Sequence, residues 1–412
     1  MEVVYECCGG LDVQAKTVVA CLLKQGRKQL RTFATMTDEL LQLADWLASE
    51  GCTHVAIEST GVYWKPVFNI LEGVVQVILV NARHIKAVPG RKTDVRDCEW
   101  LADLLRHGLL KASFIPPLEI RELRELTRYR QTLVTEHTAV ANRLQKLLES
   151  ANIKLGQVAS DVLGLSGRLM LRAIADGEQD AEKLAELAQG KLKSKKGELR
   201  RALAGRLTQA QRWVLAEFLT RLDETEAALS RVEARIGEEV KTCPDPFVKE
   251  AVALLDSMPG VGERVAQTII AEIGVDMDRF PSAKHLASWA GMCPGNNESA
   301  GKRRSGQTTK GSKYLRTALV EAAWAATRAK GTYLQAQYQR LVKRMPKKKA
   351  LVAVAHTLRV IGYHLLSRRV AYADLGSDYV DRQHIERQRR RLVERLAALG
   401  VKVTIEEVAE AA

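Results

Sequence analysis

The chain has 412 residues, of which 46% are hydrophobic, and 63 Lys and Arg against 49 Asp and Glu give a formal net charge of +14 at pH 7. This length predicts two or three domains, each large enough for a hydrophobic core. The charge favours nucleic acid as a partner over a membrane surface, because the sequence has no apolar run of about eighteen residues and no signal peptide before Asp12.

Seven cysteines are scattered along the chain without a C-x-x-C pair. This pattern disfavours a zinc ribbon or a disulfide framework and favours a reducing, cytoplasmic setting. Together with the basic charge, it predicts a cytoplasmic protein that associates with nucleic acid.

Residues 1–115 are predicted to form an α/β domain with a mixed sheet. Short β-branched and apolar runs bounded by turn residues predict three consecutive strands, at 3–13, 17–23 and 28–33. The chain then alternates between a helix capped by Thr37, a strand at 54–57, a helix over 63–71, a strand at 74–80 and a last helix ending near Leu105. Such an order indicates an antiparallel meander that continues into right-handed crossovers, with helices on the faces of the sheet.

The last of these helices opens with the stretch from Arg91 to Asp97. With Thr93 as its N-cap, Asp94 and Asp97 lie three residues apart on one face, at the end of the helix where the dipole favours negative charge. The bases Lys92 and Arg96 lie beside them and are candidates for binding a phosphate. Taken alone, this spacing is more typical of an ordinary helix start with solvated charges.

Two further acids follow predicted strands. Asp12 lies near the end of the first strand, and Glu58 comes directly after the strand at 54–57. If these strands are neighbours, both acids lie at the carboxyl edge of the sheet, where α/β proteins form their sites. Packing of the Asp94 and Asp97 helix over that edge would gather four carboxylates. Four oxygen ligands suit Mg²⁺ or Mn²⁺, and two such ions can hold the attacking and leaving oxygens of a phosphodiester.

Three motifs carry a family resemblance: Gly10-Leu-Asp-Val13, Ile57-Glu-Ser-Thr-Gly-Val-Tyr-Trp64 and Lys92-Thr-Asp-Val-Arg-Asp97. They resemble the RuvC-like domain of DEDD transposases, the recombinases of one large group of bacterial insertion sequences. The resemblance implies an RNase H/RuvC-like fold. It also implies that the catalytic metal ligands are Asp12, Glu58, Asp94 and Asp97.

Residues 116–245 are predicted to be helical. Apolar residues at three-four spacing over 118–152 and 207–240 predict either an antiparallel hairpin or a coiled-coil dimer seam, and an internal helical bundle fits the same periodicity. Between them, the basic run from Lys191 to Arg201 fits a nucleic-acid contact or a solvated linker equally well. The basic face of the first long helix is a candidate for phosphate contacts, through Arg121, Arg124, Arg128, Arg130, Arg143 and Lys146. For either helix taken alone, charge exposed to solvent is the default interpretation.

Residues 246–370 are predicted to form a mainly α-helical domain, followed by a charged helical tail over 371–412. Near its start, a Pro-Gly-Val-Gly turn at 259–262 joins two helices and resembles the helix-hairpin-helix motif, which binds nucleic-acid backbone. Gly260 and Gly262 would allow close approach of a phosphate to the free N–H groups of the second helix. Plain helix connections also contain such turns.

A polar, Gly-rich loop follows, from Ala290 to Arg316. A hydroxyl in such a loop can attack phosphorus if nearby bases stabilise the developing charge, and Ser299, Ser305 and Ser312 compete for this role on chemistry alone. The loop is similar to the second domain of the same transposases, which implies Ser299 as the nucleophile. The bases expected to hold phosphates are Lys302, Arg303, Arg304, Lys310, Lys313 and Arg316.

The resemblance therefore implies a DNA recombinase that excises and inserts its own mobile element through metal-binding carboxylates and a covalent phosphoserine. It implies donor and target double-stranded DNA as partners, an element-encoded bridge RNA as in some members, and a homodimer or tetramer. Two alternatives stay open. A Holliday-junction-type nuclease would need the four acids and no serine, and a non-catalytic nucleic-acid-binding protein would need neither.

Overall fold

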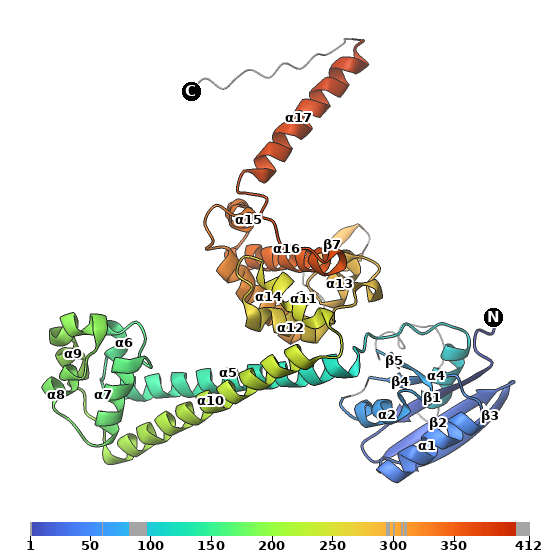
Figure 1. Cartoon of the computed structure of the whole chain (residues 1–412), viewed down its shortest axis with the longest axis horizontal. Helices are drawn as coiled ribbons and strands as arrows, with labels where there is room; N and C mark the ends of the chain where they lie inside the picture. The colour runs from blue at the N-terminus through green and yellow to red at the C-terminus, as the bar shows by residue number, and fades with distance from the viewer. Residues whose placement is uncertain are drawn as a thin grey trace. The chain divides into compact units, whose positions relative to one another are not determined.

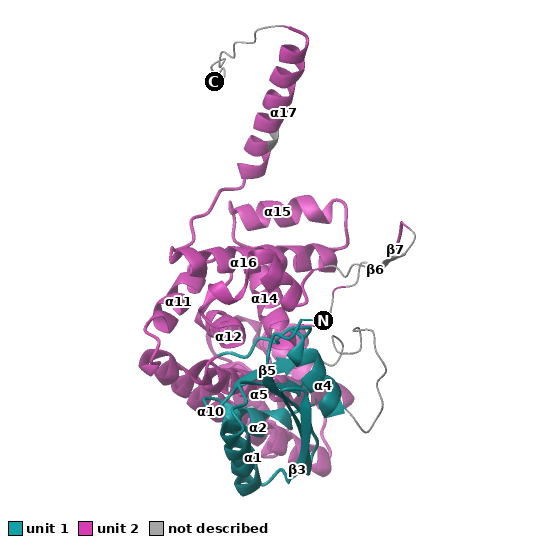
Figure 2. Cartoon of the chain, turned by 90° about the vertical axis from the view of Figure 1, so that its right-hand side faces the viewer, with its two compact units in different colours: residues 1–116 teal, residues 117–412 magenta. Residues whose placement is uncertain are grey.

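The computed structural model describes residues 2–59, 61–81, 97–293, 297–299, 301–305, 308 and 311–400, without the side chains of 297–299, 303–305 and 384. The chain divides into two compact units, residues 1–116 and residues 117–412 (Figure 2). The first unit contains a mixed sheet with helices, and the second is mainly helical.

The sheet of the first unit has five strands in the order β3-β2-β1-β4-β5. β2 pairs antiparallel with both β1 and β3, whereas β4 pairs parallel with both β1 and β5. The predicted mixed sheet is therefore confirmed. The bounds of the strands are β1 Cys7–Val13, β2 Thr17–Lys24, β3 Arg27–Ala34, β4 His54–Glu58 and β5 Gln76–Val80.

The first strand begins four residues later than predicted. The amides of Val4 and Tyr5 do not pair with the sheet but donate to the carbonyl oxygen of Arg106, at 2.8 and 3.2 Å. The expected cap of the first helix is also shifted by one residue: the helix begins at Thr37, and the N-cap is Met36, which makes no side-chain capping bond.

Helices cover both faces of this sheet (Figure 1). α1 (Thr37–Ser49) and α2 (Trp64–Leu71) share one hydrophobic core with the side chains of Leu11, Leu22 and Ile57. On the other face, α4 (Asp97–Arg106) packs on Cys8, Cys21 and Ala56. The alternation of buried side chains along each strand therefore supplies two apolar layers from one sheet.

Two long helices dominate the first part of the second unit, α5 (Leu118–Ser150) and α10 (Gln209–Thr242) (Figure 1). Gln211 bonds to Ser150 at one end of the pair and His137 to Glu226 further along, so the helices run antiparallel. Their apolar side chains find partners within the same chain, which is the hairpin alternative. A coiled-coil seam between two chains stays a prediction.

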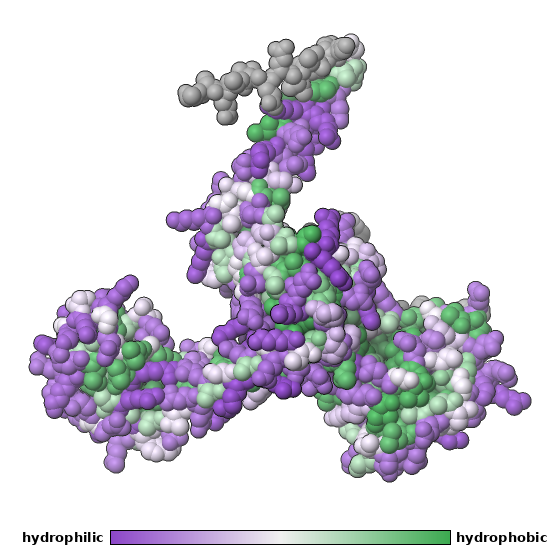
Figure 3. Space-filling model, in the orientation of Figure 1, coloured by the Kyte–Doolittle hydropathy of each residue, from purple (hydrophilic) through white to green (hydrophobic). Residues whose placement is uncertain are grey.

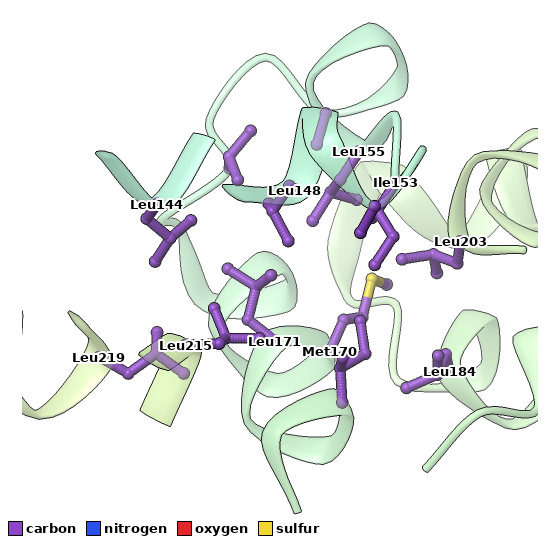
Figure 4. Packing of buried hydrophobic residues seen from close by; sticks show 14 of the residues in the cluster. Leu144, Leu148, Ile153, Leu155, Met170, Leu171, Leu184, Leu203, Leu215 and Leu219 are labelled. Atoms are coloured by element: carbon purple, nitrogen blue, oxygen red, sulfur yellow. The ribbon is translucent and has the colours of Figure 1, made fainter. Parts of the chain in front are cut away.

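A small helical lobe lies between α5 and α10 in the sequence and packs on their ends. Its core gathers Leu144 and Leu148 of α5, Met170 and Leu171 of α7, and Leu215 of α10 (Figure 4). The helices of the lobe are α6 Leu155–Val158, α7 Leu165–Ala175, α8 Ala181–Glu186, η1 Gly190–Lys195 and α9 Lys196–Leu203.

In the rest of the second unit, α16 (Lys347–Arg368) contacts α11, α13, α14 and α15. By length and composition α16 could cross a membrane, but Val354, Ala355 and Leu358 are buried, as in the core helix of a helical domain. The other elements are α11 Phe247–Asp256, α12 Glu263–Ile273, η2 Met277–Arg279, α13 Ala283–Trp289, β6 Asn297–Ser299, β7 Lys302–Ser305, α14 Lys313–Ala326 and α15 Tyr333–Val342.

The charged tail forms α17 (Tyr379–Ala398), as the sequence predicts. Figure 3 shows mainly hydrophilic residues along it, interrupted by apolar side chains such as the exposed Ile385 and Leu392. The short segment expected at 401–404 lies outside the described residues.

Candidate active site

Two of the four predicted acids lie at one edge of the sheet. β1 and β4 are parallel neighbours in which Leu11 pairs with Ile57, so Asp12 and Glu58 are the next residues on adjoining strands. Glu58 in turn pairs with Val80 of β5. The expectation that these strands adjoin is confirmed, and both half-buried acids lie at the carboxyl edge.

Gly10 brings the helix that starts with Asp97 directly onto β1. A Cβ atom at Gly10 would lie 2.1 Å from the carbonyl oxygen of Cys98 and 2.5 Å from the amide nitrogen of Ala102, so only glycine allows this contact. α4 begins over Gly10 and ends where the Arg106 carbonyl accepts the amides of Val4 and Tyr5. The helix is thus antiparallel to β1, and Asp97 lies at the same end of the strand as Asp12.

The surroundings of Asp12 agree with this geometry. Its carboxylate accepts a hydrogen bond of 3.2 Å from the side-chain amide of Gln14. Burial raises the pKa of the Cys98 thiol, and the negative charges of Asp12 and Glu99 raise it further. Cys98 is therefore a buried, neutral packing residue. Glu99 is engaged elsewhere, in a 2.6 Å ion pair with Lys28 of β3.

The remaining predicted residues of this edge, Asp94, Lys92 and Arg96, lie outside the described residues. Among the residues that are described, no three His, Cys, Asp or Glu side chains come together closely enough to hold a metal ion. The chemistry of the donors nevertheless fits a hard cation, since Asp12, Glu58 and Asp97 supply only carboxylate oxygens, the ligands that Mg²⁺ and Mn²⁺ prefer.

Ser299 is the last residue of β6, and its backbone pairs with Lys302 at the start of β7. Ser305 ends β7. The third competing serine, Ser312, has a structural role, because it caps α14 and donates a 2.9 Å hydrogen bond to Glu272. This contact makes Ser312 the weakest of the three as a nucleophile.

The structure describes some of the predicted phosphate-binding bases, on β7 and at the start of α14. Lys302 is exposed on β7, the backbones of Arg303 and Arg304 follow it, and Lys310 lies outside the described residues. Lys313 is exposed and lies 4.9 Å from the ring centre of Tyr314. Arg316 donates a 2.8 Å hydrogen bond to the hydroxyl of Thr308.

The Pro-Gly-Val-Gly turn uses its two glycines differently. Gly260 has a φ of +79°, and a Cβ there would lie 2.3 Å from the carbonyl oxygen of Ala322, so this glycine allows α14 to pack against the turn. Gly262 is the exposed N-cap of α12, and a Cβ there would meet nothing within 4 Å. Packing thus accounts for Gly260, whereas phosphate binding at Gly262 stays a prediction.

A buried polar contact between α5 and α12 was not predicted from the sequence. Arg128 makes two hydrogen bonds to the carboxylate of Glu272, of 2.8 and 3.0 Å, and Arg130 donates to Gln267 at 2.7 Å. Arg124 donates to the carbonyl oxygens of Ala271 and Glu272, and burial lowers its pKa to about 10. The prediction of a phosphate-binding face is therefore wrong for these three arginines, which bind α12 instead.

The sequence did contain one signal for this contact: Glu272 is an isolated acid in the apolar run Ile269-Ile-Ala-Glu-Ile273. Its partner Arg128 lies 144 residues earlier in the sequence, on a different helix. No local pattern could pair them.

Comparison with known proteins gives two family matches. A model described as a transposase, of the DEDD IS110 type, matches residues 9–153, and one described as the transposase IS116/IS110/IS902 family matches residues 252–339. The chain belongs to the IS110-type DEDD transposases. It is accordingly a DNA transposase or recombinase.

The chain is similar in sequence to relatives over most of their length. The transposase is 23% identical to a pilin gene-inverting protein of Moraxella bovis, over 87% of this chain and 94% of the relative. It is 24% identical to the transposase for insertion sequence element IS1111A of Coxiella burnetii, over 71% of this chain and 72% of the relative. It is 29% identical to an uncharacterized 43.6 kDa protein of insertion element IS110 from Streptomyces coelicolor, over 61% of this chain and 65% of the relative.

The family suggests that the transposase depends on a divalent metal and acts on DNA. The carboxylate edge of the first unit falls within the first match and Ser299 within the second. Most of the helical lobe lies in neither, since the residues between the two matches are 154–251.

Proposed function

We propose that this transposase excises and inserts its own insertion sequence through DNA strand cleavage at two groups of residues, the acids of the first unit and Ser299 of the second. The observation that carries the proposal is the carboxylate edge. Asp12 and Glu58 end adjoining parallel strands, and α4 starts with Asp97 at the same end of β1.

We assign the first unit to the RNase H/RuvC-like fold, which the mixed β3-β2-β1-β4-β5 sheet with helices on both faces supports. The residues that would hold Mg²⁺ or Mn²⁺ are Asp12, Glu58, Asp94 and Asp97. When bound, such an ion stabilises negative charge on the oxygens of the scissile phosphate. The carboxylates would hold the ion at the sheet edge, and Gly10 fixes the distance of α4 from β1.

Ser299 acts as the nucleophile in this proposal. Its Oγ forms a bond to phosphorus while the bond from phosphorus to the leaving sugar oxygen breaks, and the hydroxyl proton is lost as the leaving oxygen gains one. Attack on the phosphoserine by a hydroxyl of the new partner strand restores the serine and a phosphodiester. The bases Lys302, Arg303, Arg304, Lys310, Lys313 and Arg316 neutralise phosphate charge around the hairpin.

The partners in this proposal are the donor and target duplexes, in the bacterial cytoplasm. An element-encoded bridge RNA, as in some members of the family, would select them. Because two strands of two duplexes must be cut and rejoined, the working form is a dimer or a tetramer, and α5 and α10 are candidates for a coiled-coil contact between copies.

Strand cleavage and the covalent protein–DNA adduct test this function together. Asp12→Asn, Glu58→Gln, Asp97→Asn and Ser299→Ala should each lower the yield of adduct about a hundredfold or more, because each removes a group that acts on the transition state. Asp103→Asn is the matched control, since this acid belongs to the same helix as Asp97 but is 52% exposed and pairs with His107 at the other end.

The control should retain the wild-type rate. Cleavage without an adduct, at the full rate in Ser299→Ala, would favour the Holliday-junction-type nuclease. Full activity of Asp12→Asn and Asp97→Asn would contradict both enzymatic functions and favour the DNA-binding alternative.

A further inference from the structure

One buried carboxylate, that of Glu272, joins three helices of the second unit. Its side chain is 2% exposed. Arg128 of α5 donates two hydrogen bonds to it, of 2.8 and 3.0 Å, and the hydroxyl of Ser312 at the start of α14 donates a third, of 2.9 Å. α5, α12 and α14 are therefore held to one another at a single side chain.

The local structure disfavours an acid at this position. Glu272 is the residue before the last of α12, where the helix dipole opposes negative charge, and its burial removes the hydration of a carboxylate. Arg128 offsets the charge, and Arg124 satisfies the carbonyl oxygens at the end of the helix. Because apolar side chains commonly replace a buried ion pair without loss of stability, this arrangement indicates a positional role.

The hydrogen bond to Glu272 is made by Ser312, the residue that directly follows segment 290–311, and this segment contains Ser299. Ser312 follows this segment directly, and its hydroxyl donates to Glu272 while it accepts the amide of Leu315 as the cap of α14. One residue earlier, a Cβ at Gly311 would lie 2.3 Å from the backbone of Ala290, so the two ends of the segment are in backbone contact. The return of the segment to the helical core is thus fixed beside Ser312.

We propose that Glu272 is a positioning residue, which holds Ser312 and the start of α14 so that the β6–β7 hairpin presents Ser299 to the scissile phosphate. The proposal rests on the role assigned to Ser299 above. Glu272 does not touch the reacting atoms; it acts through Ser312.

Two variants test the contact from its two sides. Glu272→Gln preserves size and one acceptor oxygen but removes the charge that Arg128 and Ser312 bind. Ser312→Ala removes the hydrogen bond to α14 and leaves the pair of Arg128 and Glu272 intact. The matched control is Glu233→Gln, because Glu233 of α10 forms a 2.8 Å ion pair with Arg264 near the opposite end of the same α12.

The measurement is the single-turnover rate of adduct formation at saturating DNA, with DNA affinity and melting temperature recorded for each variant. Both variants should lower this rate about tenfold or more, since a small displacement of a nucleophile is enough for such a loss. DNA affinity should stay within about twofold and the control should match the wild type. The double variant should be no slower than the slower single variant, because both changes act on one contact.

Wild-type rates of adduct formation in Glu272→Gln and Ser312→Ala would overturn the proposal. A lower rate that is fully explained by weaker DNA binding or by a lower melting temperature would overturn it as well. If Glu272→Gln does not fold, the rate of Ser312→Ala alone decides. Failure of the proposed function is separable, because an adduct that persists in Ser299→Ala removes the serine assignment itself. If Ser299→Ala forms no adduct while Glu272→Gln and Ser312→Ala react at the wild-type rate, Ser299 remains the nucleophile and only the role of Glu272 is wrong.

Discussion

The contact at Gly10 determines where Asp97 lies. With no side chain there, the backbone of α4 comes down onto β1, and a Cβ would lie 2.1 Å from the Cys98 carbonyl oxygen. This close backbone contact therefore helps to fix the acid that begins α4 relative to Asp12 near the end of β1. The neighbouring Gly9 has no such role, since the nearest atom to a Cβ there is 3.3 Å away.

Gly10→Ala should destabilise the first unit by about 2–3 kcal/mol, because a methyl group in a closed contact forces the helix and strand apart. Hydrogen exchange of the amides of β1 and α4 in the full chain measures this change locally. Gly9→Ala is the control and should cost clearly less. Equal exchange rates in the two variants would show that the closeness of α4 to β1 does not depend on Gly10.

Among the helices of the second unit, α5 and α10 bury one set of apolar side chains inside the chain, and part of this set packs on the lobe. Leu171 of α7 is fully buried in the core of the lobe, whereas Leu165 of the same helix is 69% exposed. The lobe therefore packs around one hydrophobic core, to which the ends of α5 and α10 also contribute.

Leu171→Ala should lower the stability of the lobe by about 2–5 kcal/mol, as expected for a large-to-small change in a closed core. Local hydrogen exchange over residues 155–203 would report the loss. In Leu165→Ala the same amides should exchange as in the wild type. Similar behaviour of the two variants would mean that α7 does not pack as described.

The elements of the first unit could be predicted from the sequence because their signals are local. Strand runs, turns and the order of helices gave the mixed sheet, and adjoining strands then brought Asp12 and Glu58 to one edge. The start of β1 could not be predicted, since Val4 and Tyr5 pair with the distant carbonyl of Arg106.

The second unit was less predictable for a related reason. The arginines of α5 looked like a phosphate-binding face, because three-four spacing records which side chains share a face but not what covers that face. Their partners on α12 lie 134 to 148 residues away in sequence. Likewise, the structural role of Ser312 depends on its contact with Glu272, 40 residues away in sequence, which no local pattern indicates.

In the proposed function, the two compact units of the molecule contribute different groups to one reaction. The first supplies carboxylates at a sheet edge, and the second supplies the serine on a hairpin whose return is held by a buried ion pair. The two family matches fall on these same two regions, and the part of the chain between them contains most of the lobe.

The proposed function requires that Asp12, Glu58 and Asp97, together with Asp94, bind a divalent metal. Titration of the DNA-free protein with Mn²⁺, followed by the loss of the free-ion paramagnetic resonance signal, tests it most directly. We expect wild type and Asp103→Asn to bind equally well, and Asp12→Asn, Glu58→Gln and Asp97→Asn each to bind about tenfold more weakly or worse. Unchanged Mn²⁺ affinity in all three variants would contradict the account.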